Sequence, residues 1–595
     1  MTDALLDESQ RCVAEIAYGT RQVVTAGPGA GKTETVAALL EHLVEQEGLA
    51  MESEILAISF SNAAVNAVDR RLRAKSLPPA IVQTLDSLAA DIIRDLGEGD
   101  LASMSFDDRI LEARKLLDAQ HWPRLENVMH LVIDEVQDIV GVRADLLRAI
   151  LERIDESAGF TLLGDLAQGI YDFQIREGDG SSVPISRTTA VELMHSACAD
   201  HGAQQRVLSG QYRARTRETS AAAALREAAL STNRRTEIDE FRSSLVVAGD
   251  IAKTAESAAR WKGSTAFLTT TNGQALLVAQ QLNSAGHSVE LRRDPREQPY
   301  AEWIARALGQ SPRRGLERAE FDAAVSRAGA SLPTADLWRA LRTVAGSRGS
   351  ELDLTHLAAR LALRRSLVPA LTDHAGDQFV VSTIHRAKGL EFDNVVLVDF
   401  PARDLEADEA AIAEAARVQF VALTRASGRI VRASGPSDSG LTANTFGHNS
   451  TRWVRKGFKG GVTNAEIMPA DVVPSELRGD DALRAQEALR SARGGMQRFE
   501  IVMDPRRSTL NHPVYTIQLG GVVVAVTSDS FGSAIARHRF GTPERGRPVW
   551  PTLGPAVSDT LITVPGASDS AAARWGLWLA PRLAGLIHID WQAAS

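Results

Sequence analysis

The stretch VVTAGPGAGKT, residues 23–33, decides how this chain folds. Its apolar start is typical of a buried strand, and glycines then alternate with small residues up to Lys32 and Thr33. Backbone N–H groups of such glycines can surround phosphate oxygens, and the start of a helix adds positive potential. The pattern therefore predicts a strand, a phosphate-binding loop and a helix. A plain glycine-rich turn is the alternative, but strand, lysine and threonine together weigh against it.

The roles within this loop follow from its chemistry. We expect Lys32 to reach the β and γ phosphates of ATP and Thr33 to ligate Mg²⁺. The nucleotide-binding residues expected from this segment are Gly27, Gly29, Gly31, Lys32, Thr33 and Glu34.

A second stretch, LVIDEVQD at residues 131–138, ends an apolar run in carboxylates. Ligand sites in open α/β sheets lie at the carboxyl ends of the strands. We expect Asp134 to hold Mg²⁺ through water and Glu135 to orient and deprotonate the attacking water as general base. Surface acids are the alternative, but solvation explains poorly why acids end an apolar strand.

Apolar runs alternate with helix-periodic segments twice along the chain, which predicts two open α/β sheets. The expected strands are residues 23–26, 55–58, 131–133 and 161–163, then 266–269, 379–382 and 395–398. Further on, Ser434 to Asn449 are rich in small polar residues and indicate a linker. Short strands are expected at 498–503, 514–519 and 522–527, with Gly520-Gly521 as a hairpin turn. For Trp550, Trp575, Trp578 and Trp591, core packing is favoured over base stacking.

Composition sets limits on the function. The 595 residues are 44% hydrophobic and 24% charged, which suits about three to five soluble folding units. The formal net charge of -9 argues against polyanion binding through overall charge, so any nucleic-acid contact must be local. Cys12 and Cys198 form no CxxC or Cys/His group, which disfavours disulfides and zinc and fits a cytoplasmic protein. Neither a secretion signal nor a membrane segment is expected.

Ordered segments across residues 6–433 resemble the UvrD/Rep family of superfamily 1 DNA helicases. They are LDESQ at 6–10, the loop at 26–33, DEVQD at 134–138, GDLAQGIYDF at 164–173, QYR at 211–213, VSTIHRAKGLEFD at 381–393 and FVALTRA at 420–426. The resemblance implies an α/β fold with two RecA-like P-loop-type domains, small inserted helical subdomains and a further C-terminal domain that contains β-strands.

The same resemblance assigns roles around the nucleotide. Gln10 would read the adenine edge, Tyr212 would stack on adenine, and Glu391 would lie near the ribose. Gln168 would sense the γ-phosphate. Arg213 and Arg425 would act as arginine fingers from the second α/β domain, so that hydrolysis requires domain closure.

DNA contacts are also implied by the resemblance. Tyr171 and Phe173 would present rings to bases, although aromatic core packing is the alternative. The full set is Phe60, Asn62, Thr84, Tyr171, Phe173, Thr383 and His385. In TLDS at 84–87, Asp86 stands where the family usually has a DNA-facing histidine, and a carboxylate there would repel phosphate.

These motifs give an expected domain plan. The first motor domain, which binds ATP, covers 1–84 and 129–209, and a short helical insertion covers 85–128. The second covers 210–300 and 378–433, and its insertion covers 301–377. A linker at 434–470 and a C-terminal accessory domain at 471–595 complete the plan.

The expected function is an ATP-dependent translocase or helicase on single-stranded DNA, with tailed duplex DNA as a further substrate. The family implies 3′-to-5′ movement, and the small insertions make translocation a safer expectation than strong unwinding. Two alternatives remain: a nucleotide-switched DNA-binding subunit that regulates a partner nuclease, and an RNA motor.

Overall fold

The computed structural model describes residues 6–59, 82–97, 101, 104–171, 175, 186–292, 299–330, 332–346, 350–363, 371–372, 378–401, 409–446, 450–457, 461–492, 496–538, 550–558 and 560–591. The chain divides into two compact units. The first comprises Met1–Val246, Ala387–Val395 and Asp404–Ile430, and the second comprises Val247–Arg386, Val396–Arg403 and Val431–Ser595. The two units are described in turn.

The first unit is built on a six-stranded sheet in which every adjacent pair is parallel. Its order is β3 (Val82–Gln83), β2 (Ile55–Ser59), β4 (His130–Asp134), β5 (Gly159–Gly164), β1 (Arg21–Ala26) and β6 (Gln204–Leu208). Four of these strands, β1, β2, β4 and β5, are almost entirely buried, as expected for a parallel sheet covered on both faces.

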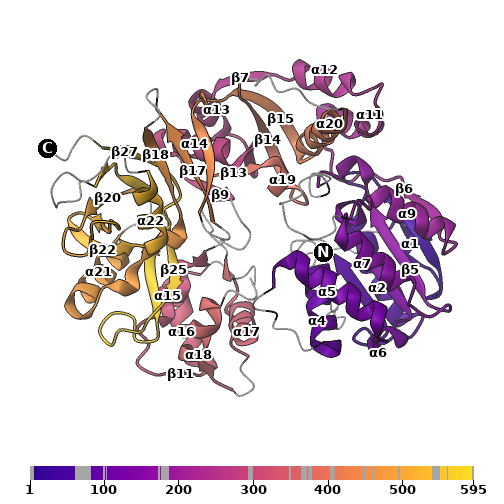
Figure 1. Cartoon of the computed structure of the whole chain (residues 1–595), viewed down its shortest axis with the longest axis horizontal. Helices are drawn as coiled ribbons and strands as arrows, with labels where there is room; N and C mark the ends of the chain where they lie inside the picture. Colours follow the sequence, from indigo (N-terminus) through magenta and orange to yellow (C-terminus); the bar gives the residue numbers. More distant parts are fainter. Residues whose placement is uncertain are drawn as a thin grey trace. The chain divides into compact units, whose positions relative to one another are not determined.

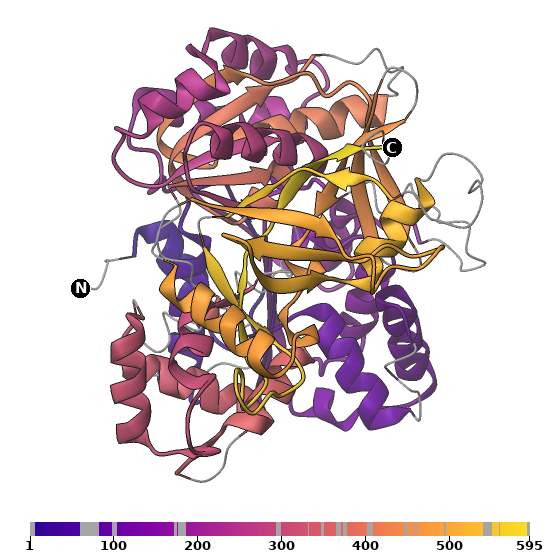
Figure 2. The same cartoon turned by 90° about the vertical axis from the view of Figure 1, so that its left-hand side faces the viewer.

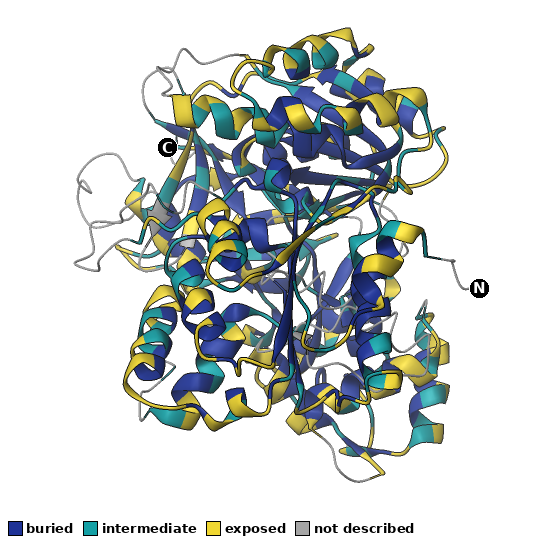
Figure 3. Cartoon of the chain, turned by 90° about the vertical axis from the view of Figure 1, so that its right-hand side faces the viewer, coloured by how far each residue is buried: buried dark blue, intermediate teal, exposed yellow. Residues whose placement is uncertain are grey.

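Helices cover both faces of this sheet because alternate strand residues point to opposite sides. Val24 and Val132 pack against α1 (Glu8–Ala14) and α2 (Lys32–Glu45). Val23 and Leu131 pack against a second layer, which consists of α4 (Leu85–Leu96), α5 (Phe106–Ala119), α7 (Val142–Leu151) and α9 (Ala190–Ala199). Figure 1 shows this sheet and these helices in indigo and purple, and Figure 3 shows the strands buried and the outer helix faces exposed.

Further helices complete the first unit. They are α6 (Pro123–Glu126), α10 (Arg217–Ala224), α11 (Arg226–Leu230), α12 (Thr236–Ser244) and α20 (Glu409–Leu423). Residues 210–246 thus belong to the compact unit that holds the phosphate-binding loop, whereas the sequence analysis placed them in the second motor domain. Their helices α10, α11 and α12 pack against α20 of the same unit, which explains the difference.

A second six-stranded sheet has the order β7 (Val247–Asp250), β15 (Ala426–Ser434), β14 (Phe392–Asp399), β8 (Thr265–Thr269), β13 (Phe379–Thr383) and β9 (Val289–Arg292). Strand β13 pairs in parallel with β8 and β9, and β15 pairs in parallel with β7. Helices α13 (Ile251–Ala258) and α14 (Asn272–Ser284) pack on this sheet in the second unit. The boundary between the compact units runs through β14 and β15.

The second unit also contains a helical insertion and an extensive antiparallel region. The helices are α15 (Glu302–Leu308), α16 (Arg318–Ala328), α17 (Thr334–Ala345) and α18 (Leu354–Ala362), with the short pair β11 (Gly315–Leu316) and β12 (Leu352–Asp353). Strand β10 (Tyr300–Ala301) pairs with β25 (Leu561–Pro565), which pairs with β26 (Leu577–Pro581). Figure 2 shows the insertion beside the C-terminal segments, and one hydrophobic core joins them.

Two five-stranded antiparallel sheets complete the second unit. One has the order β16 (Leu441–Phe446), β17 (Ser450–Lys456), β18 (Val462–Ile467), β27 (Gly585–Asp590) and β23 (Thr552–Leu553). The other has the order β19 (Val472–Val473), β22 (Val522–Thr527), β21 (Tyr515–Leu519), β20 (Gln497–Met503) and β24 (Ala556–Ser558). Helices α21 (Gly479–Ser491) and α22 (Asp529–Arg537) contribute Leu489 and Phe531 to the joint core.

The α/β fold class with a further strand-containing C-terminal region is confirmed. The hairpin turn is also confirmed, because Gly520 and Gly521 both have positive φ, of 55° and 82°. Core packing of the late tryptophans is confirmed. Trp578 belongs to the joint hydrophobic core, Trp575 and Trp591 pack against it, and Trp550 is buried. Each of the four indole N–H groups donates to a backbone carbonyl.

The interval 434–470 is not a linker but contains β16, β17 and β18. Small polar residues of this interval, such as Thr442 and Asn444, lie in a strand that is partly exposed to solvent, so a polar composition does not distinguish this strand from a linker. Among the described residues, no helix is both long enough and apolar enough to cross a bilayer.

Candidate nucleotide site

The glycine-rich loop runs from the end of β1 at Ala26 to the start of α2 at Lys32. Gly29 and Gly31 have φ of 79° and 81°, a left-handed conformation that favours glycine. A Cβ atom at Gly29 would lie 2.2 Å from Oε1 of Gln211, and one at Gly31 would lie 2.3 Å from Nε2 of Gln10. The backbone conformation therefore favours glycine at both positions, whereas the two glutamine side chains are flexible at the ends that come close.

Lys32 meets the acidic pair directly. Its Nζ donates a hydrogen bond to Oε2 of Glu135 at 3.2 Å. Burial opposes the charged form of Lys32, but attraction by Glu135, Asp165 and Asp134 raises its pKa above the ordinary value. The lysine is therefore a fixed cation at the start of α2.

Asp134 and Glu135 have opposite electrostatic surroundings. Burial, and then repulsion by Glu135, raise the pKa of Asp134. Burial would also raise the pKa of Glu135, but Lys32, Lys388 and a hydrogen bond from Gln137 lower it below the ordinary value. The two adjacent carboxyl groups thus differ in pKa. Asp134, whose pKa is raised, is suited to bind a cation, and Glu135, whose pKa is lowered, stays ionised.

The backbone of Glu135 is strained. Its φ of 57° and ψ of 41° are left-handed, and among the described residues it is the only non-glycine with positive φ. Such a conformation costs on the order of 1–2 kcal/mol for an ordinary L-residue. Strain of this kind concentrates at functional sites, so the backbone independently marks Glu135.

Gln137 connects the acidic pair to the segment after β5. Its Nε2 donates to Oε2 of Glu135, and its Oε1 accepts a hydrogen bond from the backbone N–H of Asp165 at 2.9 Å. The side chain is 1% exposed. Gln137 therefore fixes the Glu135 carboxylate, a role that the sequence analysis did not foresee.

Gln168 and Arg425 form a buried polar contact within the first unit. Gln168 donates from Nε2 to Asp165 at 2.7 Å and accepts from Nη2 of Arg425 at 3.0 Å. Arg425 is 1% exposed, and burial, followed by repulsion from Arg213, lowers its pKa to about 9. An anion between the two guanidiniums would relieve that repulsion.

Arg213 lies in the same compact unit as the phosphate-binding loop. It donates to Oε1 of Glu391, and its Nη1 donates to the carbonyl of Thr424 at 3.1 Å. The sequence analysis assigned both arginines to the second α/β domain. Arg425 does directly precede β15 of the second sheet, but both arginines pack in the first compact unit.

The residues expected around adenine meet beside Gly31. Gln10 is 3% exposed, and its Nε2 donates to the carbonyl of Ala30 at 3.5 Å. The ring of Tyr212 lies 3.4 Å from the position of a Cβ at Gly31, and its hydroxyl donates to Asp7. The backbone N–H of Tyr212 donates to the carbonyl of Gly29 at 2.8 Å. A half-exposed aromatic ring and a buried amide thus flank the loop.

Lys388 adds a contact that the sequence analysis had included in a motif without a role. Its Nζ donates to Asp138 and to the carbonyl of Gln168. The ring centroid of Tyr171 lies 5.5 Å from this Nζ, a cation–π distance. Burial raises the pKa of Asp138 to about 6, although Lys388 acts in the opposite direction. Tyr171, expected to contact DNA, thus lies against a lysine of the nucleotide site.

The other expected DNA contacts are dispersed. Thr84 caps α4, where its Oγ1 accepts from the N–H of Ser87 at 3.2 Å. Thr383 ends β13, and His385 lies in α19 (Ile384–Ala387), both in the second unit. Phe60, Asn62 and Phe173 lie outside the described residues.

Asp86 has a partner within the first unit. Its carboxylate forms an ion pair with Arg143 at 2.8 Å, and Arg143 also binds Asp107 at 2.8 Å. A paired carboxylate repels phosphate less than an isolated one, so Asp86 has a structural role at this position.

The residues present fit a nucleoside triphosphate with Mg²⁺. Lys32, Arg213 and Arg425 place three cations in one unit, and Arg213 and Arg425 repel each other in the absence of an anion. Thr33 and Glu34 lie in the first turn of α2, and Asp134 ends β4. No group of three His, Cys, Asp or Glu side chains among the described residues could hold a metal ion. Mg²⁺ commonly takes one or two protein ligands together with phosphate oxygens, which Thr33 and Asp134 could supply.

A glycine-rich loop after one buried parallel strand and paired acids after another define a P-loop nucleotide-binding protein. Residues 9–174 match the family described as an AAA domain, and residues 334–431 match the UvrD-like helicase C-terminal domain. A putative ATP-dependent DNA helicase of Acanthamoeba polyphaga mimivirus is 29% identical over 159 residues, which are 24% of this chain and 22% of that protein. Two separate segments of the chain thus match family models, and the second of these models is that of a UvrD-like helicase.

The chain thus spans about a fifth of the length of the curated relative that it matches. Among solved structures, it is similar to a Pif1 helicase from Candida albicans, with 12% identity, a TM-score of 0.36 and coverage of 72% of this chain and 94% of that chain. A Bacteroides Pif1 helicase in complex with ADP-AlF3 and single-stranded DNA has 13% identity, a TM-score of 0.32 and coverage of 72% and 92%.

Proposed function

We propose that the protein is an ATP-dependent translocase on single-stranded DNA that moves 3′ to 5′ and also acts on tailed duplexes. The observation that carries ATP hydrolysis is the convergence of Lys32, Glu135 and Arg425 in one compact unit. A protein that only senses a nucleotide needs the loop and the lysine but not a positioned base and arginines. The match of residues 334–431 to the UvrD-like helicase C-terminal domain, and the similarity to a putative ATP-dependent DNA helicase, support DNA as the track.

The proposed chemistry assigns one task to each side chain. Lys32 and the loop amides hold phosphate oxygens, and Thr33 and Asp134 hold Mg²⁺, which neutralises phosphate charge when bound. Phosphate competes with Glu135 for Lys32, so binding raises the basicity of Glu135 and prepares it to take a proton from water. Gln168, Arg213 and Arg425 stabilise the charge that develops on the transferred group.

The decisive test compares the wild-type protein with Glu135→Gln and Lys32→Ala. Glu135→Gln should bind ATP but lower turnover roughly 10²- to 10⁴-fold, because the amide cannot accept the proton. Lys32→Ala should weaken nucleotide binding itself. Phosphate release would be measured with and without oligothymidine, and strand displacement with 3′- and 5′-tailed duplexes.

Several outcomes would contradict the proposal. If the wild-type protein hydrolyses no ATP even with oligothymidine, the motor assignment fails and a nucleotide-switched subunit of a nuclease replaces it. If oligouridine stimulates hydrolysis better than oligothymidine, the track is RNA. Faster displacement of 5′-tailed duplexes would reverse the proposed direction.

A further inference from the structure

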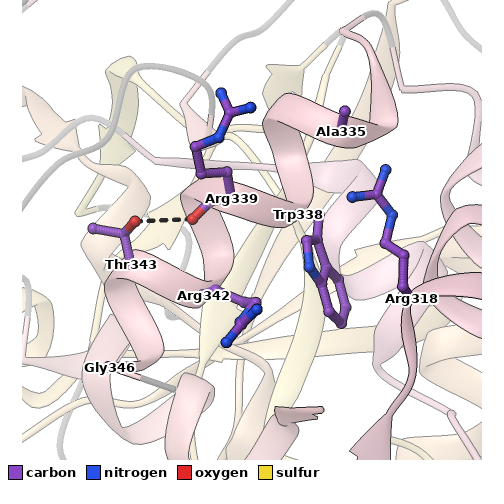
Figure 4. Close-up of a pocket in the computed structure, with 7 residues that line it drawn as sticks. All are labelled: Arg318, Ala335, Trp338, Arg339, Arg342, Thr343 and Gly346. Carbon is purple, nitrogen blue, oxygen red and sulfur yellow. Dashed lines mark hydrogen bonds between the residues drawn. The ribbon is translucent and has the colours of Figure 1, made fainter. Parts of the chain in front are cut away.

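A cavity of about 600 Å³ lies between α16 and α17 in the helical insertion of the second unit. Arg318, Trp338, Arg339 and Arg342 line it, and together they are called the Arg–Trp pocket (Figure 4). Arg342 follows Trp338 by four residues and Arg339 by three on α17, so helical periodicity places its side chain near each of them. None of these residues belongs to the nucleotide site.

Trp338 contacts two of the three arginines. The indole is 7% exposed, and its ring lies 5.0 Å from that of Phe321, which contributes to the joint core. The guanidinium carbons of Arg318 and Arg342 lie 5.7 and 5.9 Å from the Trp338 ring centroid. A guanidinium stacked on a fixed indole loses less conformational entropy when it binds a ligand.

The carboxylates near the pocket are weak competitors for a ligand. Arg318 pairs with Asp322 at 2.8 Å, where the side chains are 40% and 38% exposed. Arg339 pairs with Asp336 at 3.2 Å, where they are 63% and 53% exposed. Exposed ion pairs of this kind contribute about 0–1 kcal/mol and are screened by salt. A polyanion can therefore displace them at small cost.

The chemistry of the pocket favours nucleic acid. Guanidinium forks match phosphate oxygens, and the outer face of a stacked guanidinium can accept an unpaired base. Acidic peptides offer carboxylates but no flat ring for that outer face. A cavity of this size accommodates a nucleotide unit. The chain has a formal net charge of -9, so a polyanion must bind at a local group of positive charges such as these arginines.

We propose that the Arg–Trp pocket binds the phosphate backbone of a DNA strand, as a contact separate from the motor motifs. The choice of DNA rests on the proposed function, whereas the pocket rests on its own geometry. The insertion would then help to hold the track in a sequence-independent way, because phosphate contacts carry no base code.

The test measures binding of fluorescein-labelled oligothymidine by anisotropy over a range of salt concentrations. The double variant Arg339→Gln/Arg342→Gln should bind about tenfold more weakly, and the slope of log K against log [salt] should shrink by about 1 to 2. Arg339→Glu is the second variant, because this exposed side chain can be exchanged without disturbing the core. It should also weaken binding and lower the salt slope.

The matched control is Arg313→Gln/Arg327→Gln, which removes two exposed charges from the same insertion outside the pocket. It should bind oligothymidine like the wild-type protein. Equal loss in the control and the pocket variants would overturn the proposal, as would wild-type affinity and salt slope in Arg339→Glu. If labelled oligoglutamate binds the wild-type protein but not the pocket variants, while oligothymidine binding is the same in all of them, the occupant is an acidic protein partner instead.

Failure of the proposed function gives a different result. In that case the wild-type protein neither binds oligothymidine nor hydrolyses ATP faster in its presence, and both proposals fall. If the wild-type protein binds oligothymidine and hydrolyses ATP faster in its presence, but the pocket variants bind oligothymidine as tightly as the control variant does, the pocket proposal alone is wrong.

Discussion

At Gln137, one buried amide serves two parts of the nucleotide site. It donates to the Glu135 carboxylate and accepts from the Asp165 backbone N–H, so the base is tied to the segment after β5. Strained residues persist only where the surrounding structure holds them, and this hydrogen bond is one of the contacts that hold Glu135. The orientation of the Glu135 side chain therefore depends on its hydrogen bond with Gln137.

Replacement of Gln137 by leucine should lower kcat for ATP about tenfold or more, because Glu135 loses the donor that orients it. Binding of a fluorescent ATP analogue should change less than about threefold, since Gln137 does not contact the phosphate loop. Steady-state hydrolysis and equilibrium binding, both measured well below the melting temperature, check this split between turnover and affinity.

The control is Gln22→Leu, which removes another buried amide of the same sheet. Gln22 donates to the carbonyl of Val13 and to Thr161, away from the acids. This variant should lose stability but keep kcat. Wild-type turnover in Gln137→Leu would show that Glu135 is oriented by other groups.

The sequence predicted the residues whose roles depend on local pattern. Lys32 and Asp134 were found because a strand, a turn and a charge follow one another within a few positions. The roles of Gln137 and Lys388 depend on partners 28 and 250 residues away, so no local pattern reveals them. The pairing of Asp86 with Arg143, 57 residues away, was hidden for the same reason.

At the scale of elements, a buried polar row crosses three strands of the first sheet. Gln22 of β1 donates to Thr161 of β5, which contacts Nε2 of His130 in β4. Nδ1 of His130 contacts the carbonyl of Tyr18, so this nitrogen carries the proton and Nε2 must accept from the threonine hydroxyl. The row is complete only when His130 is neutral.

This row predicts loss of stability in mild acid. Burial lowers the pKa of His130 from 6.5 to about 4, so the unfolded chain takes up a proton in this interval before the folded chain does. The contribution of neutral His130 to the free energy of unfolding is fully present above about pH 6.5, and it decreases by about 3 kcal/mol as the pH falls to 4. Urea midpoints from circular dichroism at about pH 8 and about pH 5 would measure the decrease.

His130→Gln should reduce this pH dependence, because glutamine does not titrate, while His195→Gln on the exposed side of α9 should leave it unchanged. The same pH dependence in His130→Gln and the wild-type protein would assign the acid sensitivity to other groups.

Strands were predictable where apolar runs stand between turns, as in β1, β4 and β5. The region 434–470 was not, because strands with one exposed face carry polar residues that resemble a linker. The shared core of the insertion and the C-terminal region was also hidden. It depends on the pairing of Tyr300 with Thr563, which leaves no periodic signal in either segment.

At the scale of the whole molecule, the nucleotide site and the Arg–Trp pocket belong to different compact units. The described part of the first unit contains the loop, the acids and both arginines. Nucleotide binding should therefore stabilise the first unit directly, because a ligand stabilises the folded state that binds it.

Calorimetry should show separable transitions for the two units. A non-hydrolysable ATP analogue with Mg²⁺, at about 100 times its Kd, should raise the transition of the first unit by roughly 5–10 °C and leave the other within about 1 °C. Lys32→Ala should abolish the shift. An equal rise in both transitions would mean that the nucleotide is also held by the second unit.

The left-handed backbone at Glu135 also has a consequence for how this position can vary. Glycine or asparagine would suit the conformation better, and Asp134 and Asp165 would remain to balance Lys32. Folding by itself therefore gives no reason to keep glutamate there. Only selection for turnover opposes its replacement, so in a lineage that ceased to need ATP hydrolysis, position 135 would be among the first to drift while the fold survived.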